Sequence, residues 1–252
     1  MRVKRIEQIE DYINLHKTVT IDNLCEVFHV SRNTIRRDLD TLSAKGVVNK
    51  IYGGVTSNKT QETIPFEERN IKNMDMKNRI ARKAAEFIDN DDTLFIDSGT
   101  TATTLFNQLS EKKRLTLFTN NLEIVVKSIY ANDFHVVSTG GALARNTYST
   151  VGPDAARLLE RYNIKKAFMS ATGLSIGSGL TNSSQGEYEV KKAIISRCHK
   201  VYMLIDSSKF GDVSLMTFGR IEDADVIITD KAPSQEYLDY FREHGVELVI
   251  AD

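Results

Sequence analysis

The sequence has few cysteines, and the two it has form no recognisable site. Cys25 and Cys198 are far apart in the 252-residue chain and lack the close spacing of metal ligands. We expect each to be a small core residue in a reducing compartment, which fits the cytoplasm. The five histidines are scattered and form no ligand set either. The sequence therefore predicts no metal and no cofactor.

Long apolar runs are also absent. No stretch of about 18 consecutive apolar residues occurs, which argues against a membrane-spanning helix. The positively charged start is not followed by an apolar segment, so we expect no signal peptide. Neither sign of charge dominates, with 33 Lys and Arg against 34 Asp and Glu. With 41% apolar residues, the chain is long enough to bury a core in one large or two modest domains.

Apolar residues near the N-terminus repeat at helical spacing. Three isoleucines fall on one face of a helix over residues 2–16: Ile6, Ile9 and Ile13. After a short β-prone stretch, Thr20 can cap a second helix over residues 21–28. Residues 29–30 leave room only for a turn before a third helix begins. This order predicts a helix-turn-helix unit.

The third helix, which Ser31 can cap, has an apolar face and a cationic face. Its inward stripe repeats at i, i+4 and i+7: Ile35, Leu39 and Leu42. The outward side chains near its start are of the types that reach base edges and phosphates in the major groove: Arg32, Asn33, Thr34, Arg36 and Arg37. Gly46 follows as a left-handed residue that ends the helix. Taken alone, this helix fits an ordinary amphipathic surface helix equally well.

Residues 47–55 predict a small β-wing, in which Gly53 and Gly54 let the backbone turn. Residues 1–56 contain nine Lys and Arg against seven Asp and Glu, and five of these acids precede Ser31. For a nucleic-acid partner the distribution of charge matters more than its sum. The residues predicted to contact double-stranded DNA are Thr20, Ser31, Arg32, Asn33, Thr34, Arg36, Arg37, Lys45 and Lys50.

The rest of the chain has a different organisation. Residues 58–75 are polar and predict a linker, with Phe66 docking on the domain that follows, residues 76–252. A helix is expected over residues 76–88. Seven apolar runs then have the length of buried strands: residues 93–96, 115–119, 134–137, 167–170, 201–205, 226–229 and 246–250. Helical stretches lie between several of them: residues 122–130, 153–162, 186–198 and 235–243. The alternation predicts an α/β domain with a largely parallel sheet.

Ligands of such sheets bind at the carboxyl ends of strands. After the first predicted strand, residues 97–101 enter a helix, and their N–H groups and hydroxyls can cradle a phosphate. An ordinary helix cap is the alternative for that run. Similar loops after later strands favour a common site, and Lys209 offers a cation there, although a lone loop lysine is commonly just solvated. The predicted effector-binding residues are Asp97, Ser98, Gly99, Thr100, Thr101, Thr119, Asn120, Gly140, Gly141, Gly173, Glu187 and Lys209.

Both parts of the chain resemble the DeoR family of bacterial regulators. The N-terminal match consists of Arg5, Ile9, Ile13, Ser31, Thr34, Ile35, Arg36, Asp38, Leu39 and the Gly53-Gly54 pair. The C-terminal match consists of residues 97–101, 119–120, 140–141, 168–173, 189–191 and 206–210. The resemblance implies a winged helix-turn-helix domain that binds operator DNA through residues 20–39. It also implies a sensor domain similar to ribose-5-phosphate isomerase and the coenzyme A transferases, with phosphorylated sugars or related metabolites as effectors.

Three segments look most like the inositol-catabolism repressors within that family: residues 50–57, 163–173 and 179–183. That resemblance implies a phosphorylated intermediate of inositol breakdown as the effector. We therefore expect a cytoplasmic transcription regulator, most simply a repressor of a carbohydrate-catabolism operon. We expect a homo-oligomer as well, because operators read by helix-turn-helix proteins are usually symmetric.

Two other classes of function remain open at this point. A sugar-phosphate isomerase-like enzyme with an appended DNA-binding domain would need paired carboxyl groups to move protons. The expected counterpart of that acidic loop, residues 169–173, contains no acid, and no catalytic residue is predicted. Glu187 and Glu189 can contact ligand hydroxyls or pair with nearby lysines. A scaffold with a vestigial pocket is the third interpretation.

Overall fold

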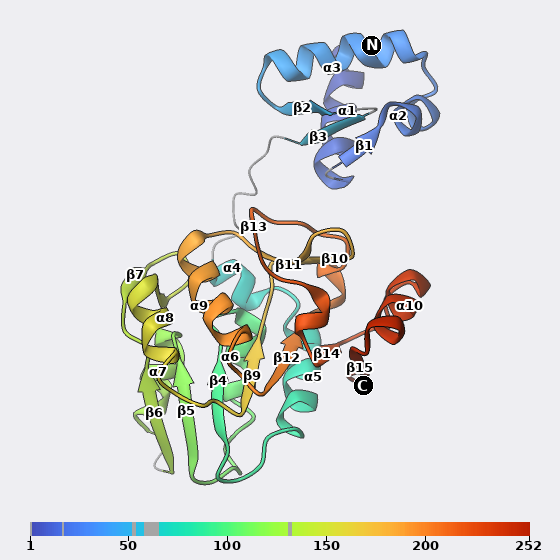
Figure 1. Ribbon diagram of the computed structural model, residues 1–252. Coiled ribbons are helices and arrows are strands. Elements are labelled where there is room, and N and C mark those ends of the chain that lie inside the picture. Colours follow the sequence, from blue (N-terminus) through green and yellow to red (C-terminus); the bar gives the residue numbers. More distant parts are fainter. Residues whose placement is uncertain (1, 17, 52–53, 58–65, 131–132) are drawn as a thin grey trace. The chain divides into compact units, whose positions relative to one another are not determined.

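The computed structural model describes residues 2–16, 18–51, 54–57, 66–130 and 133–252. The chain divides into two compact units, Met1–Ile64 and Pro65–Asp252, whose elements are labelled in Figure 1. Of the predicted linker, residues 58–65 lie outside the described residues. Residues 66–75 differ from the prediction, because they contain helix α4 (Phe66–Ile71) and the start of α5 (Met74–Ala85). Phe66 is buried, and its ring centroid lies 5.0 Å from that of Tyr148, which anchors α4 to the rest of the second unit.

The described part of the first unit consists of three helices and a three-stranded antiparallel sheet. Its helices are α1 (Arg2–His16), α2 (Ile21–Phe28) and α3 (Arg32–Ala44). Its strands are β1 (Thr18–Thr20), β2 (Val48–Ile51) and β3 (Gly54–Ser57), in the order β1-β3-β2. The helices and the wing therefore form where the sequence predicts them, while the wing residues 52–53 lie outside the described residues.

The apolar stripes of the three helices form the core of this unit. Its fully buried side chains include Ile9, Ile13, Leu24, Ile35, Leu39 and Leu42. Each such burial stabilises the fold by roughly 1.5–3 kcal/mol, so the stripes hold the helices together. Thr20 and Ser31 act as the predicted caps, accepting hydrogen bonds from the Asn23 and Thr34 N–H groups at 3.1 and 3.3 Å. Gly46 has a φ of 72°, the left-handed conformation expected of it.

A seven-stranded sheet in the order β15-β14-β12-β9-β4-β5-β6 forms the centre of the second unit. Its strands correspond to the seven predicted ones: β4 (Thr93–Ile96), β5 (Leu115–Thr119), β6 (Phe134–Ser138), β9 (Lys166–Met169), β12 (Lys200–Leu204), β14 (Val226–Thr229) and β15 (Glu247–Ile250). Every neighbouring pair is parallel. The predicted α/β class with a parallel sheet is therefore confirmed.

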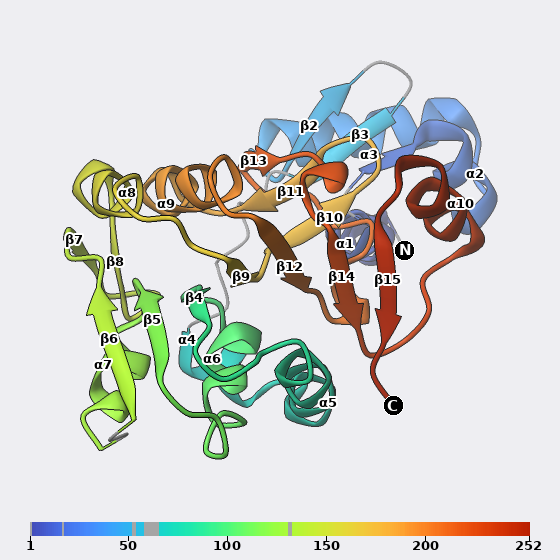
Figure 2. The same ribbon diagram turned by 60° about the horizontal axis from the view of Figure 1, so that its bottom comes forward.

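Helices cover both faces of this sheet, as Figure 2 shows. One face packs against α5, α6 (Thr100–Phe106) and α7 (Leu122–Ser128). The other face packs against α8 (Pro153–Leu159), α9 (Gln185–Ile195) and α10 (Gln235–His244). Within β4, Leu94 and Ile96 join the first core and Phe95 the second, which is the alternation of a strand buried on both sides. None of the described helices is long and apolar enough to span a membrane.

Five short strands were not predicted from the sequence. They are β7 (Ala142–Ala144), β8 (Ser149–Val151), β10 (Gly173–Ser175), β11 (Gly179–Asn182) and β13 (Met216–Gly219). They pair antiparallel, β7 with β8 and β11 with both β10 and β13. Strands of three or four residues that contain Gly, Ser and Thr have no continuous apolar run. Pairing between segments distant in the sequence therefore decides their conformation.

Because the strands of the main sheet are parallel, their carboxyl ends lie along one edge. Asp97 follows β4, Asn120 follows β5, Ser170 follows β9 and Asp206 follows β12. All four residues are at least nine-tenths buried. A row of buried polar side chains at this edge is the arrangement that the sequence predicts for a ligand site.

Candidate functional site

The first candidate site is the outer face of α3. Arg32, Asn33, Arg36 and Arg37 are exposed there, while the apolar stripe of the helix faces the core. Thr34 is half-buried, and its hydroxyl lies 3.0 Å from Ser31 Oγ. Within the described part of the chain, Arg36 and Arg37 have no ion-pair partner. Their guanidinium groups are thus available to a phosphate or to a guanine edge.

Ion pairs hold other charged residues of this unit. Asp38 is buried and accepts a hydrogen bond from Arg5 Nε at 2.8 Å, which joins α3 to α1. Two exposed pairs involve predicted DNA-binding residues: Arg32 with Asp22 and Lys50 with Asp40. Exposed pairs contribute only about 0–1 kcal/mol, so DNA phosphates can replace these carboxylates at small cost. Lys45 and Thr20 are exposed as well.

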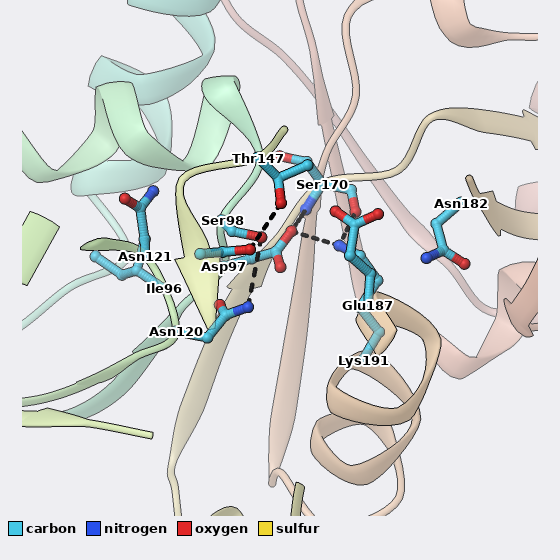
Figure 3. A network of polar contacts seen from close by, with 12 residues as sticks. Ile96, Asp97, Ser98, Asn120, Asn121, Thr147, Ser170, Asn182, Glu187 and Lys191 are labelled. Atoms are coloured by element: carbon cyan, nitrogen blue, oxygen red, sulfur yellow. Dashed lines mark hydrogen bonds and ion pairs between the residues drawn. The ribbon is translucent and has the colours of Figure 1, made fainter. Parts of the chain in front are cut away.

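The second candidate site surrounds Asp97 at the carboxyl edge of the sheet, and Figure 3 shows its polar contacts. Asp97 Oδ2 accepts hydrogen bonds from the Ser170 N–H at 3.1 Å and from Lys191 Nζ at 2.5 Å. Lys191 Nζ also donates to the Ser170 carbonyl oxygen at 2.8 Å. Asp97 is 1% exposed and Lys191 4%. Removing either partner would leave a buried charge unpaired, so the pair holds β4, β9 and α9 together.

Asn120 joins the same network from the end of β5. Its Nδ2 donates to Ser98 Oγ at 3.4 Å and to the Thr150 carbonyl oxygen at 3.2 Å. The neighbouring Thr119 does not join this network. Its hydroxyl donates to the Ile96 carbonyl oxygen at 2.7 Å. The structure therefore brings Asp97, Ser98 and Asn120 together, while Thr119 ties β5 to β4.

The predicted phosphate cradle begins α6. Gly99 is the N-cap of that helix. A Cβ at Gly99 would lie only 2.5 Å from Ser170 Cβ, so the close approach of two strand-end loops requires glycine there. Thr100 and Thr101 are 7% and 5% exposed. N–H groups in the first turn of a helix lack partners within the helix, which is what an anion cradle needs.

The remaining predicted residues have varied surroundings. The Gly140-Gly141 pair is exposed and has φ values of 62° and 108° between β6 and β7. A Cβ at Gly173 would lie 2.3 Å from the Asp212 carbonyl oxygen, so Gly173 permits a close backbone approach. Glu187 lies in the first turn of α9 and accepts a hydrogen bond from Ser184 Oγ at 3.0 Å. It is drawn beside Lys191 and Ser170 in Figure 3.

Basic residues gather near the same edge. Lys77 of α5 is 4% exposed, and its Nζ donates to the Arg69 carbonyl oxygen. Burial lowers the pKa of Lys77 to about 8; Asp206 opposes this, and the charges of Lys209 and Arg69 reinforce it. Burial likewise lowers the pKa of Arg69, with Glu187 opposing the shift. The charge of Lys77 therefore interacts with those of the predicted residue Lys209 and of Arg69, and the sequence singled out neither Lys77 nor Arg69.

Lys77 and Lys191 were both missed as site residues, although the sequence contains a usable signal for each. Lys77 precedes Ile80 and Ala84 by three and seven residues, which places it on the inward stripe of its helix. Lys191 precedes the buried Ile194 by three residues in the same way. A lysine on an apolar stripe is unusual, because burying a charge requires a partner.

The chain matches two family models, the DeoR-like helix-turn-helix domain over residues 5–61 and the DeoR C terminal sensor domain over residues 72–231. It is 42% identical over 251 residues to the HTH-type transcriptional regulator IolR of Bacillus subtilis (strain 168), covering 100% of both chains. It is 28% identical over 247 residues to the glycerol-3-phosphate regulon repressor of Escherichia coli (strain K12), covering 98% of both. A solved ribose 5-phosphate isomerase A from Methanocaldococcus jannaschii is similar over 55% of both chains, with 16% identity and a TM-score of 0.41. From the two domain matches and the full-length similarity to IolR, the chain belongs to the DeoR family of transcriptional regulators.

Proposed function

We propose that this regulator represses a carbohydrate-catabolism operon and responds to a phosphorylated sugar or a related phosphorylated metabolite. The observation that supports this most directly is that one chain contains two different candidate sites. An exposed cationic face on α3 accompanies a sheet edge where buried cations and polar side chains meet. A full-length relative is named a glycerol-3-phosphate regulon repressor, which agrees with both halves of the proposal.

Operator binding is assigned to α3 and the wing. Arg36 is exposed and has no ion-pair partner among the described residues, so it is free to form a bidentate contact with guanine. Arg37, Lys45 and Lys50 are exposed near it in the chain and supply phosphate contacts, which give most of the affinity for duplex DNA. Since helix-turn-helix operators are usually symmetric, a homo-oligomer presents two such surfaces.

Effector binding is assigned to the start of α6 and to the cations around it. The N–H groups of Thr100 and Thr101 donate hydrogen bonds to the phosphate oxygens. Lys77, Arg69 and Lys209 supply positive charge. The lowered pKa of Lys77 supports this assignment. A buried lysine among other cations is held in an unfavourable charged state, and a bound phosphate would relieve that cost.

A change at this site can reach the DNA-binding unit through the chain itself. Arg69 lies in α4 and Lys77 in α5, the first helices of the sensor unit after residues 58–65. The effector must favour one arrangement of the DNA-binding units over another, because equal affinity for both shifts nothing. A coupling of roughly 1–3 kcal/mol would change operator affinity about 5- to 150-fold.

Within this proposal, the effector is a phosphorylated intermediate of inositol breakdown. The support is the resemblance of residues 50–57, 163–173 and 179–183, together with the 42% identity to IolR. The isomerase alternative receives less support, because the full-length relatives cited above are named regulators or repressors. A turnover assay on sugar phosphates distinguishes the two.

The test is a gel shift on the operator next to the gene, at fixed salt, with a panel of sugar and inositol phosphates. Wild-type protein should bind the operator and be released by one panel member, but not by its unphosphorylated counterpart. Lys209→Ala and Thr100→Val should keep operator binding and lose the release. If both variants still release DNA normally, the phosphate site is misplaced. If unphosphorylated compounds act equally well, the effector class is wrong.

A further inference from the structure

Three buried polar atoms at the carboxyl edge of the sheet have no hydrogen-bond partner among the residues that the structure describes. They are Asp97 Oδ1, Asn120 Oδ1 and Ser170 Oγ. Their residues are only 1%, 1% and 7% exposed, respectively. Leaving a buried polar group unsatisfied is costly, so each such atom needs an explanation. Asn182 Oδ1 also lacks a partner, but Figure 3 shows Asn182 apart from the other three residues.

The hydrogen-bonding character of these atoms is defined by their surroundings. Asn120 Nδ2 faces the Thr150 carbonyl oxygen at 3.2 Å, which only the amide nitrogen can do favourably. Asn120 Oδ1 is therefore the free atom, and it is an acceptor. Asp97 Oδ1 is a carboxylate oxygen and also an acceptor, while Ser170 Oγ can donate or accept. Two acceptors and one hydroxyl at this edge are therefore buried without a hydrogen-bond partner among the described residues.

Ser170 is held unusually firmly for a residue with a free hydroxyl. Its N–H donates to Asp97 Oδ2, and its carbonyl oxygen accepts from Lys191 Nζ. Both backbone groups of one residue are thus fixed by the two members of a buried ion pair. Gly99 packs so closely that a Cβ there would lie 2.5 Å from Ser170 Cβ. These three contacts fix the backbone of Ser170, and with it the point from which the Ser170 side chain extends.

We propose that Asp97, Asn120 and Ser170 form a hydroxyl-reading subsite, and that Lys191 is its positioning residue. The ligand class is a pair of neighbouring hydroxyls on a phosphorylated polyol or sugar. Hydroxyls donate to the two free acceptors, whereas a phosphate dianion offers only acceptor oxygens and cannot satisfy them. This inference rests on the proposed function, because it places the carbon chain of the effector beside a phosphate held at Thr100 and Thr101.

The sequence order supports this geometry. Asp97 lies three residues before Thr100, and Gly99 between them touches the Ser170 position. A ligand whose phosphate meets the start of α6 therefore has its first carbons next to Asp97 and Ser170. The phosphate subsite offers hydrogen-bond donors, whereas the adjacent hydroxyl subsite offers mainly acceptors. This difference fixes the orientation of the ligand.

The experiment compares ligands that differ in hydroxyl content, using calorimetry on the full chain. The probes are propyl phosphate, which has no hydroxyl, and glycerol 3-phosphate, ribose 5-phosphate and myo-inositol 1-phosphate. At least one hydroxylated probe should bind the wild type ten times more tightly than propyl phosphate. Ser170→Ala should reduce that ratio about three- to tenfold, the worth of one hydrogen bond, without weakening propyl phosphate.

Matched variants separate positioning from general damage. Ser175→Ala removes a hydroxyl that accepts a hydrogen bond from the Ser178 N–H in the turn between β10 and β11, and it should leave the ratio unchanged. Lys191→Met should lower the ratio as Ser170→Ala does. Because Lys191→Met already displaces the Ser170 hydroxyl along with Asp97, the double variant should bind no worse than Lys191→Met alone. Ser170→Ala should also melt no lower than the wild type, since its hydroxyl has no partner among the described residues.

The possible results are distinct. A ratio unchanged by Ser170→Ala, or propyl phosphate binding as tightly as every hydroxylated probe, overturns the subsite and leaves the phosphate site intact. Failure of all four phosphorylated probes to bind overturns the subsite together with the proposed phosphate site. A strictly additive double variant overturns the positioning role of Lys191.

Discussion

Effector binding at the proposed phosphate site should weaken above pH 8, because Lys77 then loses its proton. Its pKa is lowered to about 8 by burial, and the charges of Lys209, Arg69 and Lys72 add to this shift against Asp206. A phosphate monoester keeps both negative charges above about pH 7, so the ligand itself changes little. Any change in effector affinity between pH 7 and pH 9 therefore comes from the protein.

The magnitude follows from the fraction of Lys77 that is protonated. With a pKa of about 8, that fraction is about 90% at pH 7 and about 10% at pH 9. If only the charged form binds, the apparent Kd rises about tenfold, equivalent to about 1.4 kcal/mol. The stability of the free protein should change in the opposite sense. The unfolded chain holds this proton up to about pH 10.4, so stability from this group rises as pH increases from about 8.

Calorimetric titrations with the effector at pH 7, 8 and 9 provide the assay. Lys77→Arg keeps its charge throughout this range and should bind with little pH dependence. Lys77→Met should bind weakly at every pH. Lys83→Met removes a lysine from the same helix that pairs with Glu86, and it should behave like the wild type. A tenfold weakening that persists in Lys77→Met would show that another group titrates, and the reasoning about Lys77 would be refuted.

Three further predictions concern other parts of the chain. Arg36→Ala should weaken operator binding by roughly 1–3 kcal/mol in a gel shift at fixed salt, and unchanged affinity would remove Arg36 from base recognition. Gly99→Ala should lower the melting temperature and abolish the effector response, because the new Cβ would lie 2.5 Å from Ser170 Cβ. A normal effector titration of this variant would show that the two loops can separate. Phe66→Ala should reduce the unfolding free energy of the sensor unit, measured in urea, by about 3–5 kcal/mol, because Phe66 is 2% exposed. A loss below about 1 kcal/mol would mean that α4 does not depend on this ring.

The five inner strands of the main sheet could be predicted from the sequence because they are buried on both faces, whereas the edge strands β6 and β15 are only partly buried. Each such strand is a short continuous apolar run, such as Val226–Thr229, and such runs stand out against the helices between them. The linker could not be delimited in the same way. Phe66 is one apolar residue in a polar segment, and nothing local shows that its partner is Tyr148, 82 residues further along the chain.

The candidate site was predictable in part for a related reason. Asp97, Ser98 and Asn120 follow strands directly, so parallel topology alone predicts that they meet. Lys77 and Lys191 reach the edge from helices α5 and α9 on opposite faces of the sheet. Their contribution depends on which turn of each helix faces the strand ends, and this is set by tertiary packing. Their only local signal is a lysine on an apolar stripe.

The two buried lysines have different surroundings, and this decides which of them receives ligand charge. Lys191 already has the Asp97 carboxylate at 2.5 Å, so a phosphate brought close to it would compete with a partner that is in place. Lys77 donates to a neutral carbonyl oxygen, and it has no ion pair within the described residues. Its burial cost is therefore only partly offset in the free protein, and a phosphate would stabilise its charged form. Lys191 accordingly organises the hydroxyl-reading subsite, while Lys77 is the group whose charge state an anionic effector can change.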